Sequence, residues 1–106
     1  CAGIIGASLN NNEGITGIAP CTEIVPIDIF SNINASAGQI RDAIDWAWDE
    51  GEADVLSNSW GYPASDAITQ AIGRARTQGR NGRGSVVVFA SGNSGGAVWS
   101  SNCWSY

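Results

Sequence analysis

One stretch limits the folds available to this chain: residues 85–93, with the sequence SVVVFASGN. It begins as an unbroken apolar run, which is typical of a parallel strand buried on both faces of a sheet. It ends in small residues and an amide. Open α/β sheets bind ligands at the carboxyl ends of their strands. We therefore expect function at the end of this stretch, from Ala90 to Asn93.

Two helices are predicted before this strand. Ser36 and Gln39 have the spacing of a capping box, and apolar residues then recur at helical spacing over residues 40–48. A second amphipathic pattern covers residues 67–75, and Gly79 is expected to end that helix.

Two further strands are predicted: residues 23–30, which are rich in β-branched residues, and a short strand at residues 53–57. Pro26 lacks a backbone donor, so its strand should lie near a sheet edge. Residues 1–7 are small and apolar and predict the end of a helix. Alternating strands and helices indicate an α/β fold, with a parallel sheet, flanking helices and right-handed crossovers. The polar loops after the last two strands should then face each other across a cleft.

The composition excludes several classes of function. The net charge is −5, which disfavours nucleic-acid binding, and no apolar run approaches the length of a membrane span. No signal peptide is visible, and the chain contains no histidine. The three cysteines lack CxxC spacing, so thiolate metal binding is disfavoured. Cys1 lies in an apolar run and is expected to be a small buried side chain.

Two segments allow ligand-binding interpretations. The loop at residues 9–17 offers Asn and Glu oxygens and backbone carbonyls that a calcium ion could use, although these residues favour a plain surface turn. Gly3 and Gly6 suggest a nucleotide loop, but that motif requires a preceding strand, which these residues do not have.

Two chemistries fit the end of the last strand. Residues 92–96, GNSGG, match the nucleophile elbow of α/β-hydrolases, with Ser94 as nucleophile. That motif needs a helix directly after the serine and a histidine base, and the following residues are poor helix formers. Alternatively, the amide of Asn93 is a rigidly held donor that would stabilise the oxyanion of an acyl-transfer reaction.

Four segments, in order, resemble the subtilases, the subtilisin-like serine proteases. They are CAGIIGA at residues 1–7, NNEGITGIAP at 11–20, AIDWA to NSWG at 43–61, and the strand ending in Asn93. The resemblance implies a subtilisin-like three-layer α/β domain, of which residues 1–106 form a central part. Residues 97–106 do not resemble the family's continuation and are treated as an atypical end.

The resemblance also implies two substrate-binding walls and an oxyanion donor. The residues of the first wall are Ser59, Trp60 and Gly61. The residues of the second wall are Ala90, Ser91 and Gly92. Asn93 is the implied catalytic residue, donating to the oxyanion. Polypeptides are the implied substrates, and a secreted or cell-surface location is expected.

The family's catalytic Asp, His and Ser segments are not found in these residues. We therefore expect the other parts of the same domain to supply them, and the isolated chain to be inactive. No cofactor is required for this chemistry, a structural calcium ion is not assignable, and no metal ligands are predicted. The alternatives are a non-catalytic α/β binding domain or pseudoprotease, and, less favoured, an α/β-hydrolase that uses Ser94.

Overall fold

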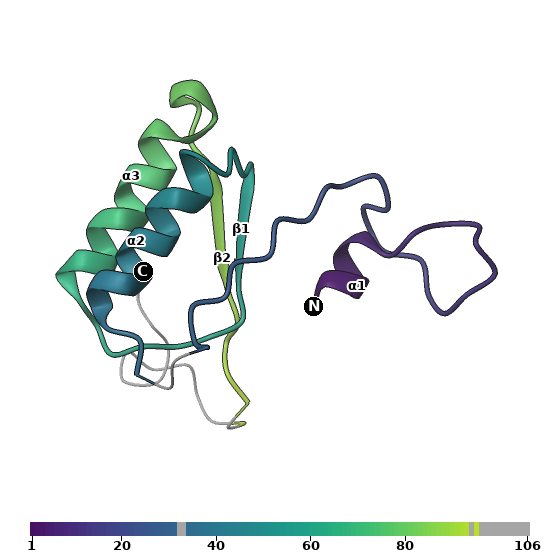
Figure 1. Ribbon diagram of the computed structural model, residues 1–106, viewed down its shortest axis with the longest axis horizontal. Helices are drawn as coiled ribbons and strands as arrows, with labels where there is room; N and C mark the ends of the chain where they lie inside the picture. Colours follow the sequence, from purple (N-terminus) through teal and green to yellow (C-terminus); the bar gives the residue numbers. More distant parts are fainter. Residues whose placement is uncertain (32–33, 94, 96–106) are drawn as a thin grey trace.

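Two parallel strands form the centre of the structure, a computed structural model that describes residues 1–31, 34–93 and 95 (Figure 1). β1 (Val55–Asn58) pairs with β2 (Val86–Phe89), and the register runs from Val55 opposite Val86 to Asn58 opposite Phe89. The parallel α/β fold predicted from the alternation of elements is therefore confirmed.

The first long helix, α2 (Ala37–Trp48), begins at the predicted capping box. The backbone N–H of Gln39 donates to Ser36 Oγ at 3.3 Å, and the backbone N–H of Ser36 donates to Gln39 Oε1 at 2.8 Å. These two bonds satisfy donors that a helix start otherwise leaves unpaired. After α2, the chain turns back at Gly51, whose N–H donates to the carbonyl of Trp46 at 2.8 Å.

The second long helix, α3 (Asp66–Gly82), is interrupted at the predicted position. Gly79 has a ψ of 158°, so the regular helix stops there and a turn follows. Gly84 has a φ of +84°, and a Cβ at this position would collide with the carbonyl of Arg76. Only glycine fits such a close approach in that backbone conformation. The turn delivers Ser85 to the sheet, where its hydroxyl donates to the carbonyl of Ala53 at 2.8 Å.

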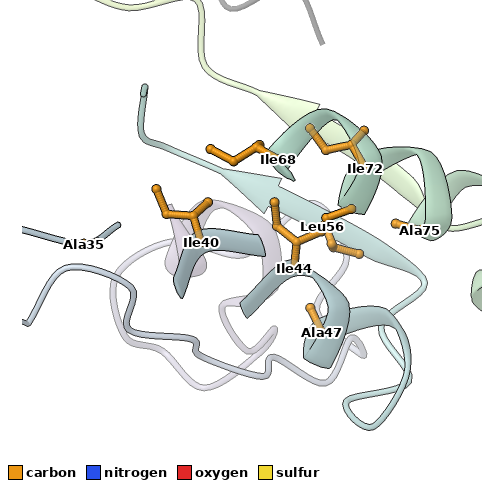
Figure 2. Packing of buried hydrophobic residues seen from close by; sticks show 9 residues of the cluster. Ala35, Ile40, Ile44, Ala47, Leu56, Ile68, Ile72 and Ala75 are labelled. Atoms are coloured by element: carbon orange, nitrogen blue, oxygen red, sulfur yellow. The ribbon is translucent and has the colours of Figure 1, made fainter. Parts of the chain in front are cut away.

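The hydrophobic core lies between the two long helices and the strands. In Figure 2, Ile40 and Ile44 from α2 point toward Ile68 and Ile72 from α3, with Leu56 of β1 beside them. Ile40 and Ile68 are fully buried, and burial of such a side chain contributes about 1.5–3 kcal/mol. Both helices lie on the same side of the strands (Figure 1), so one face of the sheet is well covered.

The opposite face of the sheet is less covered. Val55, Val86 and Val88 point away from the helices and are 57%, 51% and 50% exposed. The described residues thus form a sheet with one full helical layer. The second helical layer of the expected three-layer arrangement is not built by this part of the chain.

The N-terminal region is held together by its own backbone bonds. α1 (Ala2–Gly6) is a single short helix, as the small apolar residues at its position predicted. The N–H groups of Gly17 and Ile18 donate to the carbonyls of Ala7 and Ile4 at 2.9 and 3.0 Å. These bonds close the intervening polar loop onto α1.

The strand predicted at residues 23–30 is wrong for this structure. No sheet ladder includes these residues, and among the described residues the sheet contains only β1 and β2. Two cavities, of about 390 and 290 Å³, lie between this segment and β1. A strand requires a neighbour within hydrogen-bonding distance along its edge. The β-branched residues give the segment its strand-like sequence, but the described part of the chain offers it no strand to pair with.

Candidate functional site

The candidate site lies where β1 and β2 end. Because the strands are parallel, the residues that follow them leave the sheet at the same edge. The N–H of Ala90 donates to the carbonyl of Asn58 at 2.9 Å, which extends the pairing by one bond beyond the strands. Residues 59–61 and 90–93 thus leave the sheet at the same edge.

The side chain of Asn58 links the ends of β1 and β2 by hydrogen bonds. Its side chain is 8% exposed, and its Nδ2 donates to the carbonyls of Leu56 and Val88 at 3.2 and 3.1 Å. A buried amide with both N–H groups bonded holds its surroundings firmly, since breaking either bond would leave a buried donor unsatisfied. Sequence reasoning missed this role, because it depends on a carbonyl from the neighbouring strand.

The first wall consists of Ser59, Trp60 and Gly61. Ser59 and Gly61 are exposed, and Trp60 is partly buried. Among the described residues, no backbone hydrogen bond reaches these three positions. Their N–H and carbonyl groups are therefore available to an extended chain lying along them.

Cys1 lies beside this wall and corrects the sequence-based expectation. It was predicted to be buried, but the structure shows an exposed thiol whose Sγ is 3.1 Å from Ser59 Oγ. The prediction is wrong because α1 contributes no buried residue to a core, so its apolar sequence does not imply burial. Cys21 is likewise exposed and unpaired, while Cys103 lies outside the described residues.

Trp60 contacts two other aromatic rings. Its ring centroid is 6.0 Å from that of Phe30 and 5.2 Å from that of Phe89, with interplanar angles of 66° and 83°. Both are edge-to-face arrangements, which aromatic pairs favour. Sequence reasoning identified Trp60 but not its partners, because Phe30 and Phe89 are distant in the chain.

The second wall, Ala90, Ser91 and Gly92, is exposed, as is Asn93. Within the described part of the chain, no hydrogen bond to the side chain of Ser91 or Asn93 is found. Gly92 has a φ of +86°, a left-handed conformation that turns the chain sharply before the amide. Ser94, and the helix that a nucleophile elbow would need after it, lie outside the described residues.

A calcium site cannot be assigned among the described residues. No group of three or more His, Cys, Asp or Glu side chains that could hold a metal ion occurs among them. In the asparagine-rich loop, Asn11 Oδ1 accepts from the N–H of Glu13 at 3.1 Å, which is a turn-forming bond. Asn10 and Asn12 adopt left-handed conformations. This geometry is that of a surface turn with a single carboxylate.

The clearest pKa shift belongs to the scaffold. Burial by itself would raise the pKa of Asp45. Hydrogen bonds from Arg74 and Trp48, together with the positive charges of Arg74 and Arg41, have the larger effect. The pKa of Asp45 is therefore lowered below its ordinary value of 3.8. Arg74 Nη2 is 2.6 Å from Asp45 Oδ2, and Arg74 Nε is 3.0 Å from Oδ1. This bidentate pair joins α3 to α2 and takes no part in the loops at the sheet edge.

The comparisons with known proteins agree with the resemblance seen in the sequence. Residues 1–105 match the Subtilase family, Peptidase S8. The chain is 34% identical to the "Calcium-dependent protease" of Trichormus variabilis, with 92% of this chain and 17% of that protein aligned. It is 32% identical to "Thermitase" of Thermoactinomyces vulgaris, with 90% of the chain and 33% of that protein aligned. It is 36% identical to "Subtilisin Savinase" of Lederbergia lenta, with 84% and 32% aligned. The chain thus spans from about a sixth to a third of these relatives.

Proposed function

The chain belongs to the subtilase family, and we propose that it forms the substrate-binding cleft and the oxyanion donor of a subtilisin-like serine endopeptidase. The observation that carries this proposal is the parallel pairing of β1 and β2, which brings residues 59–61 and 90–93 to one sheet edge. Polypeptides are the proposed substrates. The proposed location is secreted or at the cell surface, by analogy with the family. Within the described residues, no helix is long and apolar enough to cross a membrane.

The first wall binds the substrate backbone. An extended peptide adds to the unpaired edge of Ser59, Trp60 and Gly61 as a further strand, so that main-chain bonds provide affinity and side-chain pockets provide selectivity. Ala90, Ser91 and Gly92 line the pocket for the residue before the scissile bond. The small side chains of this second wall support the role, because they leave room for a substrate side chain at the strand ends.

Asn93 donates a hydrogen bond from its amide to the oxyanion. This donor acts where negative charge develops on the substrate carbonyl, so its contribution appears mainly in the transition state. The amide of Asn93 is exposed and has no hydrogen-bond partner among the described residues, which supports the role. The usual magnitude for a donor of this kind, measured in a member of this family, is about 10²–10³ in turnover.

The nucleophile and base come from elsewhere in the protein. The chain has no histidine, so it contains no imidazole to serve as the base of a Ser-His-Asp triad. We propose that the isolated chain does not cleave peptides, since binding walls and an oxyanion donor cannot replace the reacting groups. A calcium ion forms no part of the proposal, because no site for it can be assigned among the described residues.

The test compares three samples on casein: the full-length protein, the same protein with Asn93→Ala, and the isolated chain. We expect the full-length protein to hydrolyse casein and to be inhibited by a serine-directed phosphonate. Asn93→Ala should lower kcat by about 10²–10³ with little change in KM. The isolated chain should be inactive.

Gln70→Ala is the matched control, because it removes an exposed amide from α3 outside the cleft. It should leave kcat unchanged. A full-length protein that binds peptides without cleaving them would support the pseudoprotease alternative instead. Phosphonate-sensitive cleavage by the isolated chain would show that its own residues include the nucleophile.

A further inference from the structure

The aromatic contacts of Trp60 connect three separate parts of the chain. Phe30 lies in the unpaired segment at residues 23–30, Trp60 lies in the first wall, and Phe89 is the last residue of β2, directly before the second wall. The indole is therefore contacted by two rings that come from different parts of the chain. We call Phe30, Trp60 and Phe89 the aromatic cluster.

This arrangement restricts the movement of the indole. Rotation about the side-chain torsions of Trp60 would break at least one of the two edge-to-face contacts. The flanking Ser59 and Gly61 are exposed and have no backbone partners among the described residues, so they provide no comparable restraint. The cluster thus restrains the bulkiest side chain of the wall, together with the packing of Trp60 against the hydrophobic core.

We infer that Phe30 and Phe89 are positioning residues that hold Trp60 as a rigid subsite wall and thereby set the size of the substrate side chain accepted beside it. This inference rests on the proposed function. A rigid indole cannot retreat to admit a large side chain, and discrimination between side chains of different size depends on such a pocket boundary. When either phenylalanine is replaced by a smaller side chain, space opens beside the indole. Trp60 can then move and admit a larger substrate side chain.

The experiment uses the full-length protein with Phe30→Leu or Phe89→Leu. Substrates are peptide pairs that differ only in alanine or phenylalanine at one position upstream of the scissile bond, with each upstream position tested in turn. At one position, the ratio of kcat/KM for the phenylalanine peptide to that for the alanine peptide should rise by about fivefold or more in both variants. Phe30→Tyr and Phe89→Tyr, which keep the ring, should retain the original ratio.

Trp46→Leu is the control, because it removes a 42% exposed tryptophan from α2, outside the cluster. Its ratios should not change. Thermal unfolding of each variant distinguishes a folding defect from a change in selectivity. Because Phe30 is 41% exposed, Phe30→Leu should still fold and provides a test even if Phe89→Leu does not. A uniform loss of kcat/KM at every position, with unchanged ratios, would show that the cluster only supports the fold.

A second measurement does not depend on turnover. The same peptide pairs, made with a reduced scissile bond, are titrated against each variant, and the ratio of their Kd values is compared. If the wild-type protein binds these peptides but does not cleave peptide substrates, the proposed function fails. The ratio of Kd values still tests the role of the aromatic cluster in that case. If the ratio is the same in wild type and both leucine variants, or if no peptide binds, the inference is overturned.

Discussion

At the residue scale, the cleft depends on groups whose importance comes from long-range contacts. Asn58 is separated by thirty positions from Val88, to which its side chain donates. No sequence motif around Asn58 marks this long-range hydrogen bond. Asn93 differs, because an amide after a buried strand and a small-residue run is visible in the sequence. Sequence reasoning therefore found the candidate oxyanion donor and missed the residue that fixes the sheet edge.

The pair of Asp45 and Arg74 predicts a dependence of stability on pH. A carboxyl pKa that is lower in the folded state stabilises the fold fully above the unfolded pKa, here near 3.8, and this stabilisation is lost as the pH falls through the folded value. Because both side chains are about one-third exposed (34% and 30%), we expect about 1 kcal/mol or less at neutral pH. Asp45→Asn should remove this amount at neutral pH and change little in strong acid.

Urea unfolding of the dilute chain, followed by tryptophan fluorescence at neutral pH and at about pH 2, measures this difference. Asp42→Asn is the control, since the pair formed by Arg41 and Asp42 is more exposed, at 45% and 66%. It should have a smaller effect at both pH values. An equal loss in the two variants would mean that general charge, rather than the bidentate pair, determines the pH response.

At the scale of elements, local signals predicted the helices well. The capping box at Ser36 and Gln39 is formed as expected, and the regular part of α3 stops at Gly79. Both features are determined by residues within a few positions of each other. The segment at residues 23–30 could not be predicted in the same way, because strand formation depends on a neighbour and not only on β-branched residues. The exposure of Cys1 was also misjudged, since its burial depends on what covers α1.

The two helix starts predict different responses to loss of a hydroxyl. Ser36→Ala removes the acceptor for the N–H of Gln39, and loss of such a cap costs about 0.5–2 kcal/mol. Ser65→Ala is a matched control, because Ser65 occupies the equivalent position before α3 but forms no side-chain cap bond. It should cost much less. Urea unfolding of the two variants under identical conditions checks the order, and an equal cost would contradict the assigned capping role.

At the scale of the whole molecule, the described residues cover one side of the sheet and leave the other open. Val55, Val86 and Val88 form an exposed apolar strip, and both outer edges of the two-stranded sheet are unpaired among these residues. Unpaired edges and apolar strips promote association between chains. The chain aligns with only about a third of two subtilase relatives, so the remaining parts of such a domain are available to cover the open face and edges.

We therefore expect the isolated chain to self-associate as its concentration rises, and Val88→Lys to weaken that association. Lysine places a charge on the open face, which disfavours contact between two such faces. The same substitution brings the net charge of −5 closer to zero, which by itself favours association. We expect the local effect on the open face to be the larger one. Ile18→Lys is the control, since Ile18 is 88% exposed and lies outside the sheet. Sedimentation velocity over a range of concentrations should show weaker association only for Val88→Lys. Monomeric wild-type chain with cooperative unfolding, or equal effects of the two lysines, would exclude the open sheet face as the cause.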